Sequence, residues 1–421
     1  MQDISKINKF DLGWLVVSFG MAIGAGIVLV PVSIGVVGFV VFAISILIAY
    51  PGIYLFQKLY ICTLFASDKP KIYKDVVGEL LGKNWSIFLG ILYFLMMLIW
   101  TVIYAQVVAK SLAAYLYLFN ITNNPHLEQN ILYSAILMVV LIFAGMKSQR
   151  ILIRVSTIFV VVLTVAIIVV SLSLIPLWTT VNITTLPNNS YELVTKTIIM
   201  LPFSLTSILF IQSLSPMVLG YRLRYPNFDN NLVLKKCLRT MKLAFVFLVI
   251  FIGFYVLSFS FVIPKQFALE ASAKNQSAFL LLEQHGMSNI ILYVCGIVIS
   301  ICAILTSFLS ILAGMAESLK GMLRISFNQP RATEKISPKV IDVIVILIIF
   351  FLTWLSIVFD APVYTLVPLS GPIFGILGCL APAYMVFKVP ALKIYRTKSI
   401  YFVIFVGIIL VISPLLTSAF S

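Results

Sequence analysis

Long apolar stretches separated by short polar connections run along nearly the whole chain. A helix that spans a membrane needs about 20 apolar residues, because each residue advances it by about 1.5 Å. Eleven segments meet this requirement, at residues 12–36, 39–65, 86–118, 130–146, 152–175, 194–219, 241–263, 288–315, 340–359, 362–387 and 399–419. The pattern therefore predicts an all-α integral membrane protein with eleven transmembrane helices and no separate soluble domain.

Three connections are long enough for helices of their own. Residues 71–81 and 228–240 mix apolar and charged positions, which predicts two short helices on the inner membrane surface. Residues 267–285 predict an outer helix.

The composition supports a membrane protein. Hydrophobic residues make up 62% of the chain and charged residues only 10%, whereas soluble domains are about one quarter charged. The net charge of +15 does not indicate nucleic-acid binding, because the basic residues lie in short clusters between apolar segments. With the N-terminus inside and the C-terminus outside, the basic residues that fall toward the outer side are only Lys110, Lys196, Lys265 and Lys274.

No catalytic or metal-binding constellation stands out. The five cysteines lie in or beside apolar segments without metal-ligand spacing, so we expect packing residues and no disulfide. His126 and His285 lie in outer loops, where solvated histidines are expected. Neither a nucleophile–base pair nor a phosphate-binding loop is present in the sequence, so the prediction is that the protein is not an enzyme.

Helix-breaking residues interrupt two of the apolar segments. The stretch GMAIGAGIVLVP at 20–31 contains Gly20, Gly24 and Gly26 and ends in a proline. Small residues can simply allow close helix packing, or they can mark a helix whose broken backbone binds a ligand. Segment 194–219 contains Pro202 and Pro216.

Corresponding interruptions in two halves of a chain are the sequence pattern of a transporter built from inverted repeats. We therefore predict one transporter domain over 1–421, with repeats at 12–175 and 194–387, discontinuous helices 1 and 6, and an extra helix at 399–419. The ends of broken helices suit a zwitterion, since half-helix N-termini attract a carboxylate and free carbonyls attract an ammonium or a cation. A free amino acid carries both charges.

The ordered motifs resemble a known family. GMAIGAGIVLVP is followed by AYP at 49–51, IYA at 103–105, SP at 215–216, KKC at 235–237, TSFL at 306–309, GMAES at 314–318 and SGPIFGILGCLAPAYMVFKVPALKIY at 370–395. Together they resemble the hydroxy and aromatic amino acid permeases of bacteria, within the amino acid–polyamine–organocation superfamily, and are most similar to its serine and threonine branch. The resemblance covers nearly the whole chain and implies the LeuT-type fold with a 5+5 inverted repeat.

The resemblance also implies which residues bind substrate. Main-chain atoms of the first break, a tyrosine of span three and the unwound part of span six would form the site. Tyr104 can instead be a packing or interfacial tyrosine. The implied substrate-binding residues are Ala22, Ile23, Gly24, Ala25, Gly26, Tyr104, Phe210, Ile211, Gln212 and Ser213.

Two departures from the family pattern concern the coupling ion. Relatives of this branch read Asn-His-Ser-Pro where this chain reads Ser213, Leu214, Ser215 and Pro216, and they carry a lysine where this chain has Thr306. The family is proton-coupled, and both missing residues can ionise. An alternative is a sodium site, in which hydroxyl and carbonyl oxygens are hard ligands for a hard cation. Its candidate residues are Gly20, Ile23, Thr306 and Ser307.

The function expected from the sequence is import of a serine-like or threonine-like amino acid by ion-coupled symport, with the proton as coupling ion. Sodium coupling, an aromatic substrate or a transporter-like sensor remain as alternatives. We expect no cofactor, no metal site, no nucleic acid and no obligate protein partner; the expected partners are the amino acid and membrane lipid. The expected location is the bacterial inner membrane. Glu317 is either an inner gate residue or a solvated charge, and Asp360 is expected to cap a helix.

Overall fold

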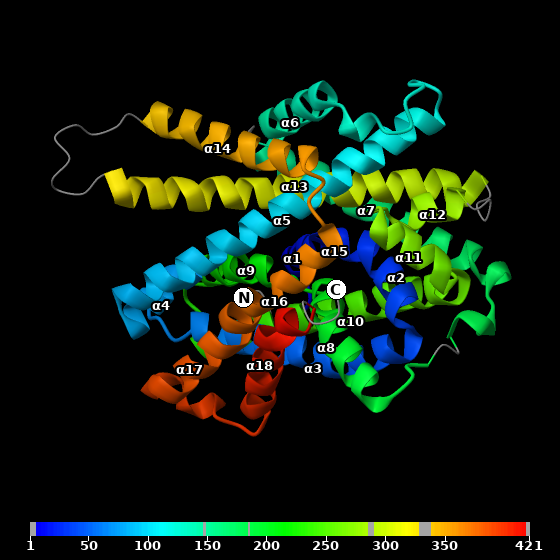
Figure 1. Ribbon diagram of the computed structural model, residues 1–421. Helices are drawn as coiled ribbons and strands as arrows, with labels where there is room; N and C mark the ends of the chain where they lie inside the picture. Colours follow the sequence, from blue (N-terminus) through cyan, green and yellow to red (C-terminus); the bar gives the residue numbers. More distant parts are fainter. Residues whose placement is uncertain (1–5, 146–148, 184–185, 285–289, 328–337, 418–421) are drawn as a thin grey trace.

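The computed structural model describes residues 6–145, 149–183, 186–284, 290–327 and 338–417, and within these ranges every regular element is a helix (Figure 1). The α-helices are α1 (Lys9–Ala22), α2 (Ala25–Val37), α3 (Phe39–Leu64), α4 (Tyr73–Leu81), α5 (Lys83–Leu118), α6 (Ile131–Gly145), α7 (Gln149–Ser173), α8 (Ser190–Thr206), α9 (Ile211–Arg224), α10 (Asn230–Val262), α11 (Lys265–Ala273), α12 (Ala278–Gln284), α13 (Ile290–Phe327), α14 (Pro338–Val358), α15 (Val363–Leu369), α16 (Gly371–Phe374), α17 (Ala381–Lys388) and α18 (Ser399–Thr417). Shorter turns are η1 (Leu127–Gln129), η2 (Ile175–Leu177), η3 (Thr180–Ile183), η5 (Pro390–Tyr395) and the π-helical η4 (Gly375–Leu380).

The predicted all-helical membrane fold is confirmed at the level of its apolar helices. Among the described residues, nine helices are long and apolar enough to cross a membrane, and a tenth span results if the bent pair α1 and α2 is one span. The apolar helix α6 is shorter than a usual span. Each of the eleven predicted segments thus coincides with a helix or a run of helices, while eleven membrane crossings stay a prediction.

Two of the expected surface helices differ from the structure. Residues 228–240 do not form a separate helix; they are the first turns of α10, which continues without a break to Val262. Neither proline nor glycine interrupts the chain between 230 and 252, so nothing ends the helix there. Of the outer segment predicted at 267–285, the described residues form two helices, α11 and α12, separated at Lys274 to Ser277, and His285 lies outside the described residues. The third, 71–81, corresponds to α4.

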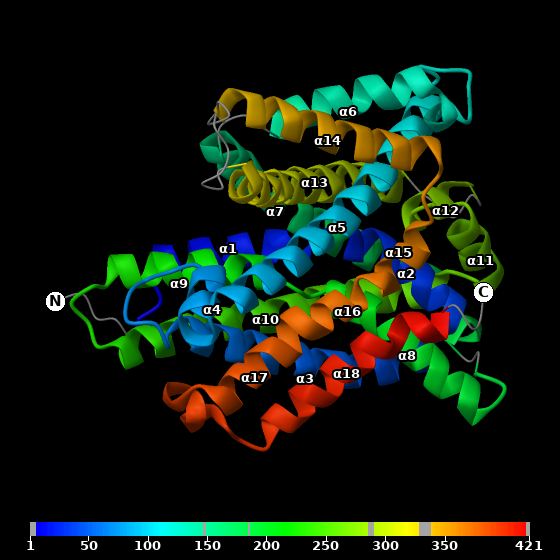
Figure 2. The same cartoon turned by 60° about the vertical axis from the view of Figure 1, so that its left-hand side comes forward.

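The helices fall into two groups that both views keep apart. Figures 1 and 2 show α6, α7, α13 and α14 together on one side, and α3, α8, α17 and α18 on the other, with α1, α2, α9 and α10 between them. Helix α5 packs along α13 and α14 and therefore belongs to the first group. Of the candidate spans, the α8–α9 segment is the most enclosed, with 78% of its apolar window buried. The second interrupted segment thus lies at the centre of the molecule.

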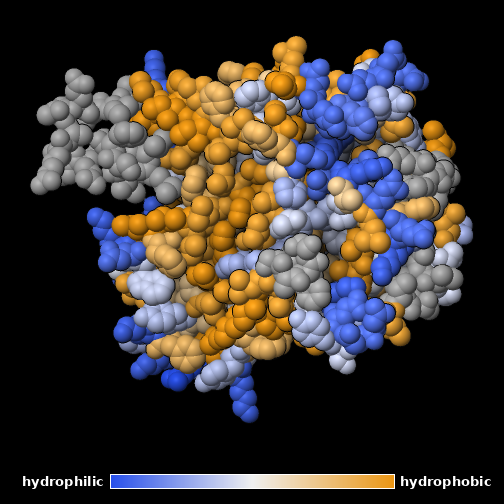
Figure 3. All heavy atoms as spheres, in the orientation of Figure 1, coloured by the Kyte–Doolittle hydropathy of each residue, from blue (hydrophilic) through white to orange (hydrophobic). Residues whose placement is uncertain are grey.

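The outer surface carries an apolar belt. Figure 3 shows a band of hydrophobic residues between two hydrophilic margins. Large apolar side chains are well exposed on several long helices, including Leu47 and Ile290, each 73% exposed, and Val140. A band of this size on a soluble protein would drive aggregation, so it is the surface expected to face lipid.

Pro31 leaves one backbone carbonyl of α2 without its helical hydrogen-bond donor. A proline has no amide hydrogen, so the carbonyl of Ile27, four residues earlier, loses its helical donor. The hydroxyl of Tyr255 on α10 donates to that carbonyl at 2.9 Å, and the Tyr255 side chain is fully buried. One hydrogen bond therefore both repairs α2 and fixes it to α10.

We expect Tyr255→Phe to lower the free energy of unfolding by about 1–3 kcal/mol, the cost of leaving a buried carbonyl without a donor. The loss should shrink in a Pro31→Ala background, because the restored amide can donate to Ile27. Equilibrium unfolding of the purified protein in detergent measures both, with Tyr117→Phe at an exposed position as control. Equal losses in the two backgrounds would contradict this role.

Candidate functional site

The first helix break lies at Ile23 and Gly24. The Gly24 amide turns back to the Ala22 carbonyl at 3.0 Å, which releases the Gly20 carbonyl from its usual helical donor. The Ile27 amide bonds Gly24 rather than Ile23, at 3.2 Å, so the Ile23 carbonyl is released as well. The axes of Lys9–Ala22 and Ile27–Val37 then differ by 49°.

Two hydroxyl groups meet the break from other helices. Ser307 of α13 donates from Oγ to the freed Ile23 carbonyl at 3.3 Å. A Cβ added to Gly24 would overlap the Tyr104 hydroxyl of α5 and would lie 2.5 Å from the Ser307 Oγ. Gly24 is therefore needed because two polar side chains approach its α-carbon closely. The structure brings Ile23, Gly24, Tyr104 and Ser307 together.

The second break separates α8 from α9 at residues 207–210. The amide of Phe210, which precedes α9, donates to the Gln57 side-chain oxygen of α3 at 3.4 Å. The Gln57 side chain is fully buried, and its nitrogen has no hydrogen-bond partner among the described residues. Tyr50 of α3 also reaches this break, with its hydroxyl 3.3 Å from the Ser207 Oγ.

The two breaks lie next to each other because their flanking helices pair. Helix α1 packs beside α9 and α2 packs beside α8. Ser18 of α1 and Ser213 of α9 are joined hydroxyl to hydroxyl at 2.9 Å. Breaks in two paired segments gather unsatisfied backbone groups at one level of the bundle, where a charged solute could use them.

Other candidate residues occupy less informative positions. Ala22 ends α1, and Ala25 and Gly26 form the first turn of α2. Ile211 is buried at the start of α9, whereas Gln212 is half-buried and has no side-chain hydrogen bond within the described part of the chain. Gly20 packs tightly against Val160 of α7.

Three further expectations have different outcomes. The side chains of Thr306 and Glu317 lie outside the described residues. The expectation for Asp360 was wrong: it forms an ion pair with Lys110 at 2.6 Å, while the Asn275 side chain accepts from the first amide of α15, that of Val363, at 3.0 Å.

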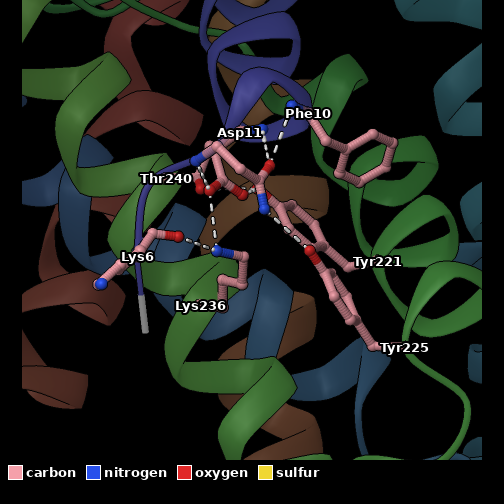
Figure 4. A network of polar contacts seen from close by, with 8 residues as sticks. Lys6, Phe10, Asp11, Tyr221, Tyr225, Lys236 and Thr240 are labelled. Carbon is pink, nitrogen blue, oxygen red and sulfur yellow. Dashed lines mark hydrogen bonds and ion pairs between the residues drawn. The ribbon is translucent and has the colours of Figure 1, made fainter. Parts of the chain in front are cut away.

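A buried ionic network fixes α1 at its N-terminal end (Figure 4). The Asp11 carboxylate, 4% exposed, accepts from the Lys236 Nζ of α10 at 2.8 Å and from the Tyr221 hydroxyl of α9 at 2.5 Å. The Tyr221 hydroxyl also lies 2.8 Å from the Thr240 Oγ1. Asn8 caps α1 and binds the Tyr225 hydroxyl at 2.9 Å. Helices α1, α9 and α10 are thereby joined through one carboxylate.

Arg222 ties the same region to the connection after α3. Its guanidinium donates to the carbonyls of Ser67, Asp68 and Lys69 at 2.9, 2.6 and 3.1 Å. The Arg222 side chain is mostly buried, so these carbonyls replace the water that would otherwise solvate its charge.

Three residues of this architecture escaped the sequence analysis, namely Asp11, Gln57 and Tyr255. Asp11 stands just before the first apolar segment, where its sequence position does not indicate burial. Gln57 could have been found, because a side-chain amide within the apolar run of 39–65 is rare in lipid. Tyr255 carried no sequence signal, because its partner is 228 residues away.

The family and the relatives that this chain matches in sequence are all permeases or amino acid transporters. The model of the tryptophan/tyrosine permease family matches residues 6–418. The chain is 37% identical over 418 residues to a probable serine transporter of Escherichia coli K12, covering 99% of this chain and 93% of that protein. It is 26% identical over 432 residues to a threonine/serine transporter of Edwardsiella tarda, covering 97% and 96%.

Two solved structures share the fold. MhsT in complex with L-phenylalanine gives a TM-score of 0.55 at 15% identity, covering 97% of both chains. A Na⁺-coupled sialic acid symporter in a substrate-bound outward-open state gives 0.53 at 13% identity, covering 97% of this chain and 90% of that one. These likenesses confirm an all-helical fold with LeuT-type neighbours.

We expect Asp11→Asn to lower the free energy of unfolding by about 3–5 kcal/mol, because Lys236 would keep a buried charge without a counterion. Lys236→Met in addition should recover part of the loss. Lys71→Gln is the matched control, since it breaks the more exposed Lys71–Glu79 pair and should cost at most about 1 kcal/mol. Thermal unfolding in detergent compares the four proteins, and similar losses for Asp11→Asn and Lys71→Gln would refute a buried ionic network.

Proposed function

Because the chain belongs to the tryptophan/tyrosine permease family, we propose that it is a secondary transporter that imports a serine-like or threonine-like amino acid across the bacterial inner membrane. Transport of amino acids through a membrane, rather than enzymatic catalysis, is what the family and the transporter relatives establish. The choice of serine or threonine is supported by the 37% identity to a probable serine transporter. The main support for placing the binding site at the first helix break is that the hydroxyl groups of Tyr104 and Ser307 both lie against Gly24.

In the proposed site, the broken backbone binds the charges of the substrate. The first amides of α2, at Ala25 and Gly26, lie at a helix N-terminus and suit a carboxylate, toward which Tyr104 can donate its hydroxyl. The N-terminus of α9, from Phe210 to Ser213, provides the same dipole from the other break. Released carbonyls at the end of α1 suit the ammonium group.

The proposed mechanism is alternating access. The helices α1, α2, α3, α8, α9 and α10 would rock against α5, α6, α13 and α14. In support of this division, α6, α13 and α14 lie together on one side of the molecule, apart from α3 and α8 (Figures 1 and 2). Asp11 would keep α1 attached to α9 and α10 during the movement. Eleven crossings, two five-helix repeats and an inner N-terminus belong to the same proposal.

For the coupling ion, we propose the proton as the first candidate. A proton route uses ionisable groups that lie inside the protein. Among the residues whose burial is described, Asp11 is the only buried carboxylate, and its bonds to Lys236 and Tyr221 join α1 to α10 and α9.

Sodium is the second candidate, and a specific contact favours it. The Ser307 hydroxyl lies 3.3 Å from the Ile23 carbonyl, which has lost its helical donor. A hydroxyl and a released carbonyl are hard oxygen ligands that suit a hard cation. The Gly20 carbonyl, released at the same break, could supply another ligand.

We expect purified protein in liposomes to accumulate labelled serine or threonine when an ion gradient is imposed. Gly24→Ala should lower uptake by more than about tenfold, because its new methyl group would displace the Tyr104 and Ser307 hydroxyls from the site. A tenfold loss corresponds to about 1.4 kcal/mol of binding free energy. Gly13→Ala, at a position with open space, is the control. Accumulation of tryptophan or tyrosine instead would overturn the substrate assignment, and no accumulation of any amino acid would overturn the function.

The two ion candidates predict opposite behaviour under separate gradients. A proton gradient alone should drive accumulation, and Asp11→Asn/Lys236→Met should abolish accumulation while leaving exchange of external for internal serine. If sodium alone drives it, Ser307→Ala should raise the half-saturating sodium concentration by about tenfold. Ser300→Ala, which also removes a buried α13 hydroxyl that bonds Tyr115, should not. Indifference to sodium would eliminate the second candidate.

A further inference from the structure

An apolar pocket opens on the surface of the molecule, away from the two helix breaks. Its volume is about 390 Å³, within the range of about 300–1,000 Å³ typical of ligand sites. It lies between the start of α5, the π-helical η4, α17 and α18, and every residue that lines it is apolar or aromatic. Its walls include Trp85, Phe88, Ile376, Tyr384, Phe387 and Ile404.

The aromatic residues of the pocket place it at a membrane boundary. Trp85 and Tyr384 are stacked with ring centroids 5.0 Å apart, and Tyr384 is 40% exposed. Tryptophan and tyrosine concentrate where a bilayer changes from hydrocarbon to headgroups. Lys83 begins α5 only two residues before Trp85, and Lys388 ends α17 directly after Phe387. The pocket thus lies where the apolar belt ends.

A cluster of basic side chains follows α17 and lies beside the pocket. The segment 388–398 contains Lys388, Lys393, Arg396 and Lys398 and no acidic residue. The Arg396 guanidinium lies 4.8 Å from the ring centroid of Phe387, so it rests on the pocket wall. All four side chains belong to exposed residues, and none has an ion-pair partner among the described residues.

Glu79, the acidic residue nearest to Lys83 in the sequence, does not supply a counterion to Lys83. Glu79 is engaged by Lys71 at 2.8 Å and by Ser67 at 2.7 Å. These two donors lower the pKa of the Glu79 carboxyl. Within the described part of the chain, the basic cluster of 388–398 therefore forms a positive rim beside the apolar pocket that no ion pair neutralises.

We propose that this pocket binds an anionic phospholipid, with one acyl chain among Phe88, Ile376 and Ile404 and the phosphate against Arg396 and Lys388. Apolar walls suit an acyl chain, and unpaired cations suit a phosphodiester. A soluble anion would satisfy the cations but would leave the pocket without an occupant. A second copy of this chain would bring the same positive rim to the contact and would repel.

The test is native mass spectrometry of the full chain in detergent, titrated with phosphatidylglycerol or with uncharged phosphatidylethanolamine of the same acyl chains. Phosphatidylglycerol should bind more tightly than phosphatidylethanolamine. Lys388→Gln/Arg396→Gln should weaken phosphatidylglycerol binding by about fivefold for each cation removed, which corresponds to about 1 kcal/mol per basic residue. Lys69→Gln/Lys235→Gln, which removes two exposed cations from segments that do not line the pocket, should leave binding unchanged.

The acyl-chain half of the proposal has its own pair of variants. Ile404→Trp fills the pocket and should weaken both lipids, whereas Ile408→Trp, one turn along α18 at a position that is 47% exposed, should not. Glycerol 3-phosphate without acyl chains should not bind.

Equal binding of the two lipids, or undiminished binding to Ile404→Trp, would overturn the proposal. A dimer that Ile404→Trp dissociates would assign the pocket to a second copy instead. None of these readouts depends on transport.

Discussion

A backbone carbonyl or amide that loses its helical partner inside an apolar bundle must find another donor or acceptor, and much of this structure follows from that constraint. Pro31 frees the Ile27 carbonyl, and Tyr255 satisfies it from α10. Near the C-terminus, Pro414 frees the Leu410 carbonyl, and the Ser413 hydroxyl donates to it at 2.9 Å. Each interruption of a helix therefore determines which polar side chain must lie beside it.

The candidate site is the place where this satisfaction is incomplete. Ser307 approaches the Ile23 carbonyl at 3.3 Å and Gln57 accepts from Phe210 at 3.4 Å, both longer than the most frequent hydrogen-bond distance of about 2.9–3.0 Å. The nitrogen of Gln57 has no partner among the described residues. Groups held in this way can exchange their weak partners for a solute at low cost. The breaks of α1–α2 and α8–α9 thus keep polar groups in the bundle that are only weakly hydrogen-bonded and can bind a solute.

The sequence predicted the features that depend on local patterns. Apolar length located all the long helices, and the glycines and prolines of 20–31 and 194–219 located both interruptions. It could not predict Asp11 as a buried charge, because burial depends on Lys236, which lies 225 residues away. For the same reason the sequence predicted a surface helix at 228–240 and a separate span at 241–263 where the structure has the single helix α10. The basic residues at 235–242 look solvated as long as the buried partner of Lys236 is unknown. Long-range pairing, rather than local propensity, explains these errors.

Helix α10 also sets the distance between the two halves of the first broken helix. Its Lys236 holds the first half of the broken helix through Asp11, and its Tyr255, 19 residues later, holds the second half through Ile27. These two anchors are about 28 Å apart along one uninterrupted axis, which fixes how far α1 and α2 can separate. A single residue inserted between them would shift the second anchor by about 1.5 Å and turn it by about 100° around the axis. The interval from 236 to 255 therefore tolerates exchange of side chains far better than a change in length.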